Sequence, residues 1–179
     1  VFISVFNPEA PSVNDLKGLY VENNGYVSID ATGFHRKHEI GEIKFDVVEG
    51  LGFDNKVVRL GDPFAKTPYL DGLVLTSNYV APVRGNKFPV LEYDFYSFQT
   101  GPVDVYTYMM PIFPLDNEHG SRYGVMVDNS PVYLPEAGAP YYSTLWIQSV
   151  LRNCRINKTT HFIDKPGKHT VKIYCAHPG

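Results

Sequence analysis

The stretch Lys168–Cys175, KHTVKIYC, decides the fold class, because its apolar and polar residues alternate along the chain. Successive side chains of a β-strand point to opposite faces, so a period of two indicates a strand with one buried face. That face would carry His169, Val171, Ile173 and Cys175. The four residues before the strand, Lys165–Lys168, have the proline and glycine of a tight turn joining the last two strands.

Two earlier segments alternate in the same way. In Val103–Met109 the side chains of Asp104, Tyr106 and Tyr108 point away from the apolar face. In Arg122–Asp128 the apolar face carries Tyr123, Val125 and Val127. This second segment runs into Asp128-Asn129, a pair that tolerates positive φ, and then into Val132. The pattern predicts a hairpin corner.

Short runs rich in Val, Ile, Tyr and Phe, separated by Gly and Pro, predict eleven strands in all. They are Val1–Phe6, Leu19–Glu22, Tyr26–Ala31, Ile43–Val48, Lys56–Leu60, Leu73–Thr76, Val90–Tyr96, Val103–Pro111, Arg122–Asp128, Ile156–Ile163 and Lys168–Cys175. Many short strands with regular turn signals favour an all-β fold, an antiparallel β-sandwich or jelly roll of the galactose-binding-like type. Ser143–Asn153 is either the one short helix, capped by Ser143 or Thr144, or a turn followed by a strand.

Composition narrows the class of protein. The 179 residues are 44% hydrophobic and 20% charged, which excludes a disordered chain and favours a single domain over residues 1–179. The net charge is −3 without a basic block, so we expect no nucleic-acid partner. The apolar runs are too short to cross a membrane. Because the first residue is Val1, we expect a chain that was processed or excised from something longer.

The residues that could carry chemistry form no recognised catalytic motif. Glu92 and Asp94 are a carboxylate pair of the kind that cleaves glycosidic bonds, but a solvated strand face also has this pattern. His35 and His38 have a spacing that a metal site can use on a helix, yet an extended polar segment is favoured. Cys154 and Cys175 are either a single bridge or two buried thiols.

Aromatic residues are the most informative class, since they make up 14% of the chain. A sugar ring stacks its apolar face on an aromatic side chain and places its hydroxyls against polar neighbours. The candidate carbohydrate-binding residues lie in or beside predicted loops; they are Tyr69, Tyr79, Tyr133, Tyr141 and Tyr142. The alternative is that these rings pin loops onto the sandwich. Trp146, between Leu145 and Ile147, is expected to be buried.

Several segments, taken in order, resemble one known family. They are Tyr20–Ala31 (YVENNGYVSIDA), Gly50–Leu60 (GLGFDNKVVRL), Pro89–Tyr96 (PVLEYDFY), Val103–Pro114 (VDVYTYMMPIFP), Arg122–Asp128 (RYGVMVD), the Trp146–Val150 step and Pro166–Gly179 (PGKHTVKIYCAHPG). Together they are similar to the C-terminal β-sandwich of glycoside hydrolase family 115, the xylan α-glucuronidases. A more distant likeness is to the jelly-roll carbohydrate-binding modules of families 6 and 35.

The resemblance implies a bacterial enzyme that acts on glucuronic or 4-O-methylglucuronic acid side chains of glucuronoxylan, secreted or periplasmic. It implies that the hydrolytic carboxylates lie in other domains, so no catalytic residue is expected here. The expected partners are the remaining domains of the parent hydrolase, plant cell-wall polysaccharide and a second copy in a homodimer.

The resemblance also bears on a structural calcium ion. The related binding modules hold calcium partly through an acidic opening segment, which corresponds here to Asp30-Ala31-Thr32. Thr32 and His177 replace carboxylates of that pattern, which argues against calcium and leaves Asp30 as a weak metal candidate. We expect no cofactor.

Three functions remain in competition. The first is an accessory domain of a glucuronoxylan hydrolase, which predicts an exposed apolar patch on the isolated domain. The second is an independent carbohydrate-binding module that uses the loop tyrosines. The third is a free-standing hydrolase that uses Glu92 or Asp94.

Overall fold

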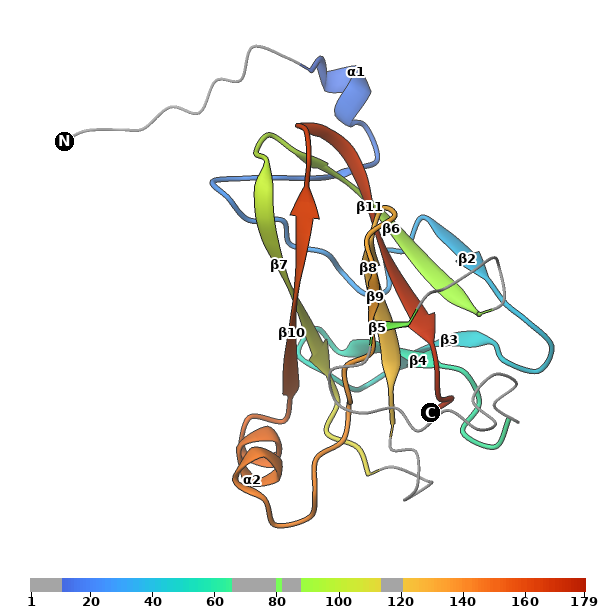
Figure 1. Ribbon diagram of the computed structural model, residues 1–179. Coiled ribbons are helices and arrows are strands. Elements are labelled where there is room, and N and C mark those ends of the chain that lie inside the picture. The colour runs from blue at the N-terminus through green and yellow to red at the C-terminus, as the bar shows by residue number, and fades with distance from the viewer. Residues whose placement is uncertain (1–10, 66–79, 82–87, 114–120) are drawn as a thin grey trace.

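The computed structural model describes residues 11–65, 80–81, 88–113 and 121–179, which form three sheets and two short helices (Figure 1). The largest sheet has the order β1-β6-β11-β8-β9-β5, with β2 paired to β6, and two-stranded sheets are formed by β10 with β7 and by β3 with β4. The bounds are α1 (Val13–Leu16), β1 (Tyr20–Val21), β2 (Arg36–His38), β3 (Phe45–Glu49), β4 (Lys56–Leu60), β5 (Val80–Ala81), β6 (Val90–Ser97), β7 (Gly101–Met109), β8 (Tyr123–Val127), β9 (Val132–Tyr133), α2 (Thr144–Leu151), β10 (Arg155–Ile163) and β11 (Gly167–Cys175).

Strand β11 lies at the centre of the largest sheet. It pairs antiparallel with β6 along one edge, where Val171 faces Tyr93, and with β8 along the other, where Val171 faces Val127. The alternation predicted for this strand is confirmed, because His169, Val171 and Cys175 are buried. Pairing on both edges leaves the backbone of β11 without an exposed edge.

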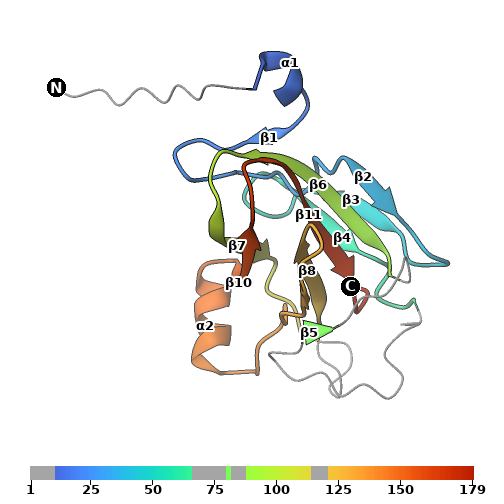
Figure 2. The ribbon, with the colours of Figure 1, turned by 45° about the horizontal axis from the view of Figure 1, so that its top comes forward.

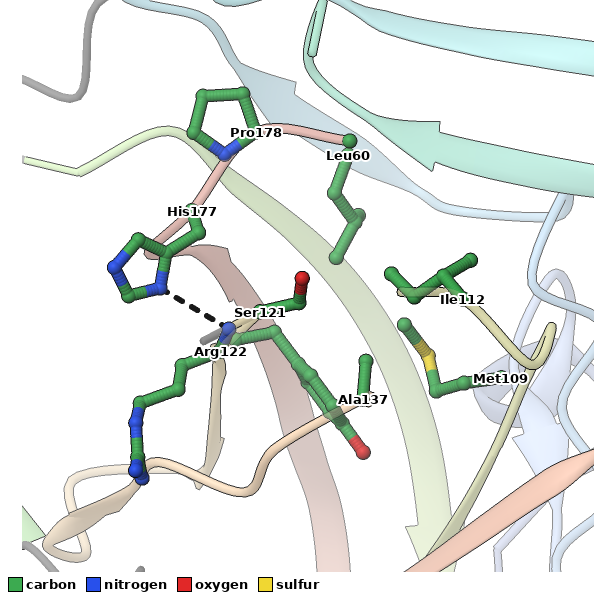
Figure 3. A pocket seen from close by; sticks show the side chains of 10 residues that line it. Leu60, Met109, Ile112, Ser121, Arg122, Ala137, His177 and Pro178 are labelled. Carbon is green, nitrogen blue, oxygen red and sulfur yellow. Dashed lines mark hydrogen bonds between the residues drawn. The ribbon is translucent and has the colours of Figure 1, made fainter. Parts of the chain in front are cut away.

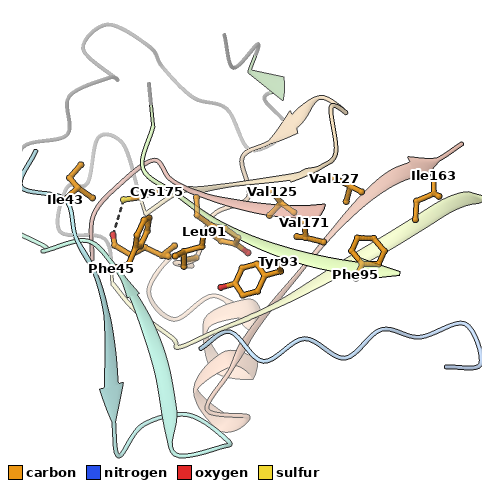
Figure 4. Packing of buried hydrophobic residues seen from close by; sticks show 13 residues of the cluster. Ile43, Phe45, Leu91, Tyr93, Phe95, Val125, Val127, Ile163, Val171 and Cys175 are labelled. Carbon is orange, nitrogen blue, oxygen red and sulfur yellow. Dashed lines mark hydrogen bonds between the residues drawn. The ribbon is translucent and has the colours of Figure 1, made fainter. Parts of the chain in front are cut away.

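The β7–β10 pair forms a second layer against this sheet (Figure 2). Val103 and Val105 of β7 and Ile163 of β10 pack on the same core cluster as the buried residues of β6, β8 and β11. Figure 4 shows Ile163 beside Phe95 and Val171 in that core. The predicted β-sandwich is therefore present.

The hairpin corner predicted at Asp128-Asn129 is also confirmed. Asp128 has φ of 52°, and β8 pairs antiparallel with β9 through Val125 and Tyr133. The Asp128 carboxylate accepts hydrogen bonds from His169 Nδ1 at 2.7 Å and from the Thr170 backbone N–H at 2.9 Å. These bonds tie the corner to the central strand.

Three sequence-based expectations about the elements need correction. Tyr26–Ala31 is not a strand, and only Tyr26 forms an isolated bridge, to Asn23. The described part of the chain contains two helices where at most one was expected. The extra turn, α1, follows Ser12, whose backbone N–H donates to Asp15 at 3.0 Å. The largest sheet is not wholly antiparallel, because β1 runs parallel to β6.

The tight turn predicted at Lys165–Lys168 does join the last two strands, β10 and β11. Because these strands belong to different sheets, the turn carries the chain from one layer to the other. The strands predicted at Val1–Phe6 and Leu73–Thr76 lie outside the described residues. Among the described residues, no helix has the length and apolar character needed to cross a membrane.

The core assignment predicts the outcome of two matched leucine substitutions. Leu91→Ala should lower the free energy of unfolding by about 2–5 kcal/mol, because a fully buried side chain is lost and a cavity remains. Leu151→Ala, at a side chain that is 81% exposed, should change it by less than about 0.5 kcal/mol. Urea titrations followed by circular dichroism measure both values, and equal losses would contradict the core described here.

Candidate functional site

Two of the predicted sugar-binding tyrosines lie together in an aromatic cluster beside α2. The rings of Tyr141 and Tyr142 have centroids 4.1 Å apart, and both contact Trp146, at 5.1 Å and 5.6 Å. Phe113, from the segment after β7, joins them at 5.7 Å from Tyr141 and 6.0 Å from Trp146. The rings are tilted by 35–69° to one another, so they do not form a flat platform.

The start of α2 fixes Trp146 beside the tyrosines. The Ser143 hydroxyl caps the helix by accepting a hydrogen bond from the Trp146 backbone N–H at 3.1 Å, so the helix alternative of the sequence analysis is confirmed. Tyr142 has φ of 58°, a left-handed conformation that is an outlier for a bulky side chain. Strain of this kind persists only where the surroundings enforce it.

Helix α2 turns most of its apolar side chains to solvent. Only Ser149 is buried, and Trp146 is half-buried rather than buried as expected. With 3.6 residues per turn, Trp146, Val150, Ile147 and Leu151 follow one another along an arc of about 140°. We call the aromatic cluster and this arc together the α2 face; it consists of Phe113, Tyr141, Tyr142, Trp146, Ile147, Val150 and Leu151.

A second exposed face lies on the outer side of the β7–β10 pair, which we call the ribbon face. Its register places Tyr108 opposite Ile156, Tyr106 opposite Lys158, Asp104 opposite Thr160 and Pro102 opposite Phe162. Tyr108 and Phe162 are each 65% exposed. Asp104 accepts hydrogen bonds from Lys158 at 2.8 Å and Thr160 at 2.7 Å, which lower the pKa of its carboxyl group.

Tyr133 does not belong to either face. It lies in β9, half-buried, with its ring edge-on to His161 at 5.1 Å. His161 is hydrogen-bonded to Ser130 at 3.0 Å and Thr159 at 2.9 Å, and its burial lowers the pKa of the imidazole. Tyr133 therefore lies against the buried His161, and its part in sugar binding stays a prediction. Tyr69 and Tyr79 lie outside the described residues.

The carboxylates considered for catalysis are held in an ion-pair cluster on the outer side of the large sheet. Arg36 makes two hydrogen bonds to Asp94, at 2.6 and 2.7 Å, and one to Glu92 at 2.5 Å. Lys168 and Thr170 also bind the Asp94 carboxylate, at 2.9 and 2.8 Å. The bonds from Arg36, with smaller contributions from Lys168 and Thr170, hold the pKa of Asp94 well below its ordinary value. An acid held in this state cannot donate a proton at neutral pH.

Two of the candidate metal-binding side chains, those of His35 and Asp30, are hydrogen-bonded within the chain. His35 Nδ1 accepts the Asp94 backbone N–H at 3.0 Å, and its Nε2 contacts the Gly18 carbonyl. His38 lies in β2, and Asp30 accepts the Thr32 backbone N–H at 2.8 Å. Across the described residues, no three His, Cys, Asp or Glu side chains come together as a metal site.

A cavity at the end of β4 is too small for a sugar. Figure 3 shows it between the end of β4 and the C-terminal segment, near Leu60, Met109 and His177. Its volume is about 20 Å³, which is room for a water molecule. His177 Nδ1 accepts the Arg122 backbone N–H at 3.0 Å along its wall.

Two further groups have structural roles. Cys154 and Cys175 are free and buried, and burial raises the pKa of the Cys175 thiol to about 12, so the interpretation as two buried thiols is the one confirmed. Asn157 is only 8% exposed, and its amide donates to Tyr123 at 2.9 Å and to the Glu136 carbonyl at 2.8 Å.

Comparison with known proteins places this sandwich in a family. Residues 19–179 match the glycosyl hydrolase family 115 C-terminal domain. The chain belongs to this family. The resemblance found in the sequence is therefore confirmed, and the domain is the C-terminal domain of a family 115 glycoside hydrolase. No curated protein matches the chain.

A solved structure supports the fold of this family 115 domain. It is a family 115 4-O-methyl-α-glucuronidase described as having specificity for decorated arabinogalactans. The match has a TM-score of 0.55 and 19% sequence identity, and it covers 82% of this chain. It covers only 16% of that chain, so most of the solved protein lies outside the matched region.

The ion-pair cluster predicts a pH dependence of stability. Asp94→Asn should lower the free energy of unfolding by about 1–3 kcal/mol near neutral pH. Because the folded-state pKa of Asp94 is lowered, its contribution is present above the unfolded-state pKa near 3.9 and is lost as pH falls toward the folded-state value. The difference between wild type and variant should therefore be constant from about pH 5 to 7 and shrink below about pH 4.

Urea titrations between pH 2.5 and 7 measure this dependence. Asp46→Asn is the matched control, because the Asp46–Arg59 pair is half exposed on both sides and should contribute less than about 1 kcal/mol. If the stability difference between wild type and Asp94→Asn grew as the pH fell, the lowered pKa of Asp94 would be contradicted.

Proposed function

We propose that this chain is a non-catalytic accessory domain of a bacterial, secreted or periplasmic family 115 hydrolase that removes glucuronic or 4-O-methylglucuronic acid side chains from glucuronoxylan. Bond cleavage belongs to other domains of the parent polypeptide. The observation that carries the proposal is the family match over residues 19–179. The parent's substrate is inferred from the family resemblance, and the neighbour's described activity supports a glucuronidase.

The arrangement of the acidic residues supports a non-catalytic role. Hydrolysis of a glycosidic bond needs two carboxyl groups that flank a sugar in a cleft. Asp94 and Glu92 are instead bound to one guanidinium group, and the buried Glu22 accepts hydrogen bonds from Ser97 Oγ and the Phe98 backbone N–H, both at 2.8 Å. None of these acids lines the cavity described above.

An activity assay tests this proposal. The 179-residue chain should release no uronic acid from glucuronoxylan, whereas the full polypeptide that contains it should. In that polypeptide, Glu92→Gln should leave kcat/KM within about twofold of wild type. Turnover by the chain alone that Glu92→Gln abolished would overturn the proposal in favour of a free-standing hydrolase.

A second candidate function, glycan binding, is favoured by the chemistry of the ribbon face. Tyr106, Tyr108 and Phe162 offer aromatic surface, and the Asp104–Lys158–Thr160 group between them both donates and accepts hydrogen bonds. Lys158 Nζ also lies 6.0 Å from the Tyr106 ring centroid. With about 6.8 Å between residues on one side of a strand, the four rungs span roughly 20 Å, an extended track suited to a polysaccharide.

Affinity electrophoresis in gels that contain glucuronoxylan or arabinogalactan tests glycan binding. Tyr108→Ala should weaken retardation by about tenfold if its ring stacks on a sugar. Tyr26→Ala is the control, because Tyr26 is 79% exposed and lies outside both faces. If Tyr141→Ala lost retardation instead, the loop tyrosines would be the binding site, as the sequence analysis predicts. If the wild-type chain showed no retardation, glycan binding would be excluded as a function.

A further inference from the structure

The α2 face differs in chemistry from the ribbon face. None of its seven residues is charged, and three of them are aliphatic. A glycan needs hydroxyl partners, whereas the centre of a protein–protein contact is depleted in charge and enriched in aromatic residues. The α2 face fits a protein surface.

The α2 face also exposes enough apolar area to contribute to a protein–protein contact. Phe113, Tyr141 and Tyr142 are 55%, 63% and 69% exposed. At about 200 Å² for each ring, they alone expose roughly 370 Å², nearly half of the ~800 Å² that each partner buries in a stable complex. Ile147, Val150 and Leu151 extend the surface at 42%, 46% and 81% exposure. A patch of this size is comparable with the largest apolar patch on a typical monomeric protein, and such patches often have a function.

The backbone of the cluster gives an independent reason to look for a role. Tyr142 is held in a left-handed conformation that costs of order 1–3 kcal/mol for a residue other than glycine. A glycine would adopt this backbone conformation without strain. The position instead carries the exposed ring of Tyr142, between Tyr141 and the capped start of α2. In the isolated domain this cost is not offset by burial of the Tyr142 ring, because the side chain stays 69% exposed.

We propose that the α2 face docks this domain onto another domain of the same polypeptide, an inference that rests on the proposed function. The matched region is 16% of the solved family 115 chain, so a polypeptide of that kind holds ample protein surface outside this domain. Linkage within one chain gives an effective concentration in the millimolar range, so a patch of this area suffices for docking. A second copy of the domain has no such linkage.

Hydrogen–deuterium exchange on the full polypeptide tests the docking. Val150→Asp places a charge in the centre of the α2 face, and it should speed amide exchange in Thr144–Leu151 by at least about tenfold. Val13→Asp is the matched control, because Val13 is 86% exposed in α1, at the opposite end of the β7–β10 layer (Figures 1 and 2). Exchange in β10 and β11 should stay unchanged in both variants.

Each outcome separates the proposal from its rivals. Unchanged exchange of α2 in Val150→Asp would overturn the docking, as would protection of α2 that depends on protein concentration, which indicates a second copy. Protection that appears only on addition of glucuronoxylan would assign the face to glycan. Faster exchange in β10 and β11 as well as in α2 would indicate a folding defect rather than undocking. That result would also count against the docking proposal. Failure of the proposed function is recognised separately, because the full polypeptide would then release no uronic acid.

Discussion

The position of β11 between β6 and β8 is the constraint on which the rest of the domain depends. One strand must bury an apolar face and at the same time pair with a neighbour on each edge. Its alternating sequence meets both requirements, because Val171 and Cys175 reach the core while Lys168 and Thr170 point outward to Asp94. The hairpin corner is attached to this strand through Asp128 and His169. The core and the outer ion-pair cluster are thus built on the same eight-residue pattern.

Much of this architecture could be predicted from the sequence, and the limits have physical causes. Strands with strict alternation, such as β7, β8 and β11, were predicted closely because one buried face imposes a period of two. Tyr26–Ala31 has strand-forming residues, but within the described ranges its one pairing is the isolated bridge from Tyr26 to Asn23, because strand pairing is a tertiary property. The parallel β1–β6 contact and the crossing from β10 to β11 also depend on long-range packing that no local pattern contains.

The candidate site was only partly predictable for the same reason. Tyr141 and Tyr142 are predictable candidates because they lie in a predicted loop, whereas Phe113 enters the cluster from a segment about thirty residues earlier. Tyr106 and Tyr108 had been placed on the outward side of their strand by alternation, and their pairing with β10 makes that side a surface. Tyr133 lies at the end of β9, beside the loop that follows, as its place in the sequence indicates, but no local pattern shows that its ring meets His161. The two resulting faces differ in charge, and this difference separates protein docking from glycan binding.

The buried amide of Asn157 has a consequence for producing this protein. Asn157-Lys158-Thr159 matches the acceptor motif for N-linked oligosaccharide, and a eukaryotic secretory host attaches such sugars to chains that are still unfolded. A sugar on this nitrogen would displace its bonds to Tyr123 and Glu136 and could not be accommodated between the two layers. A yeast or insect secretion system would therefore yield a misfolded fraction that a bacterial host, without this modification, avoids.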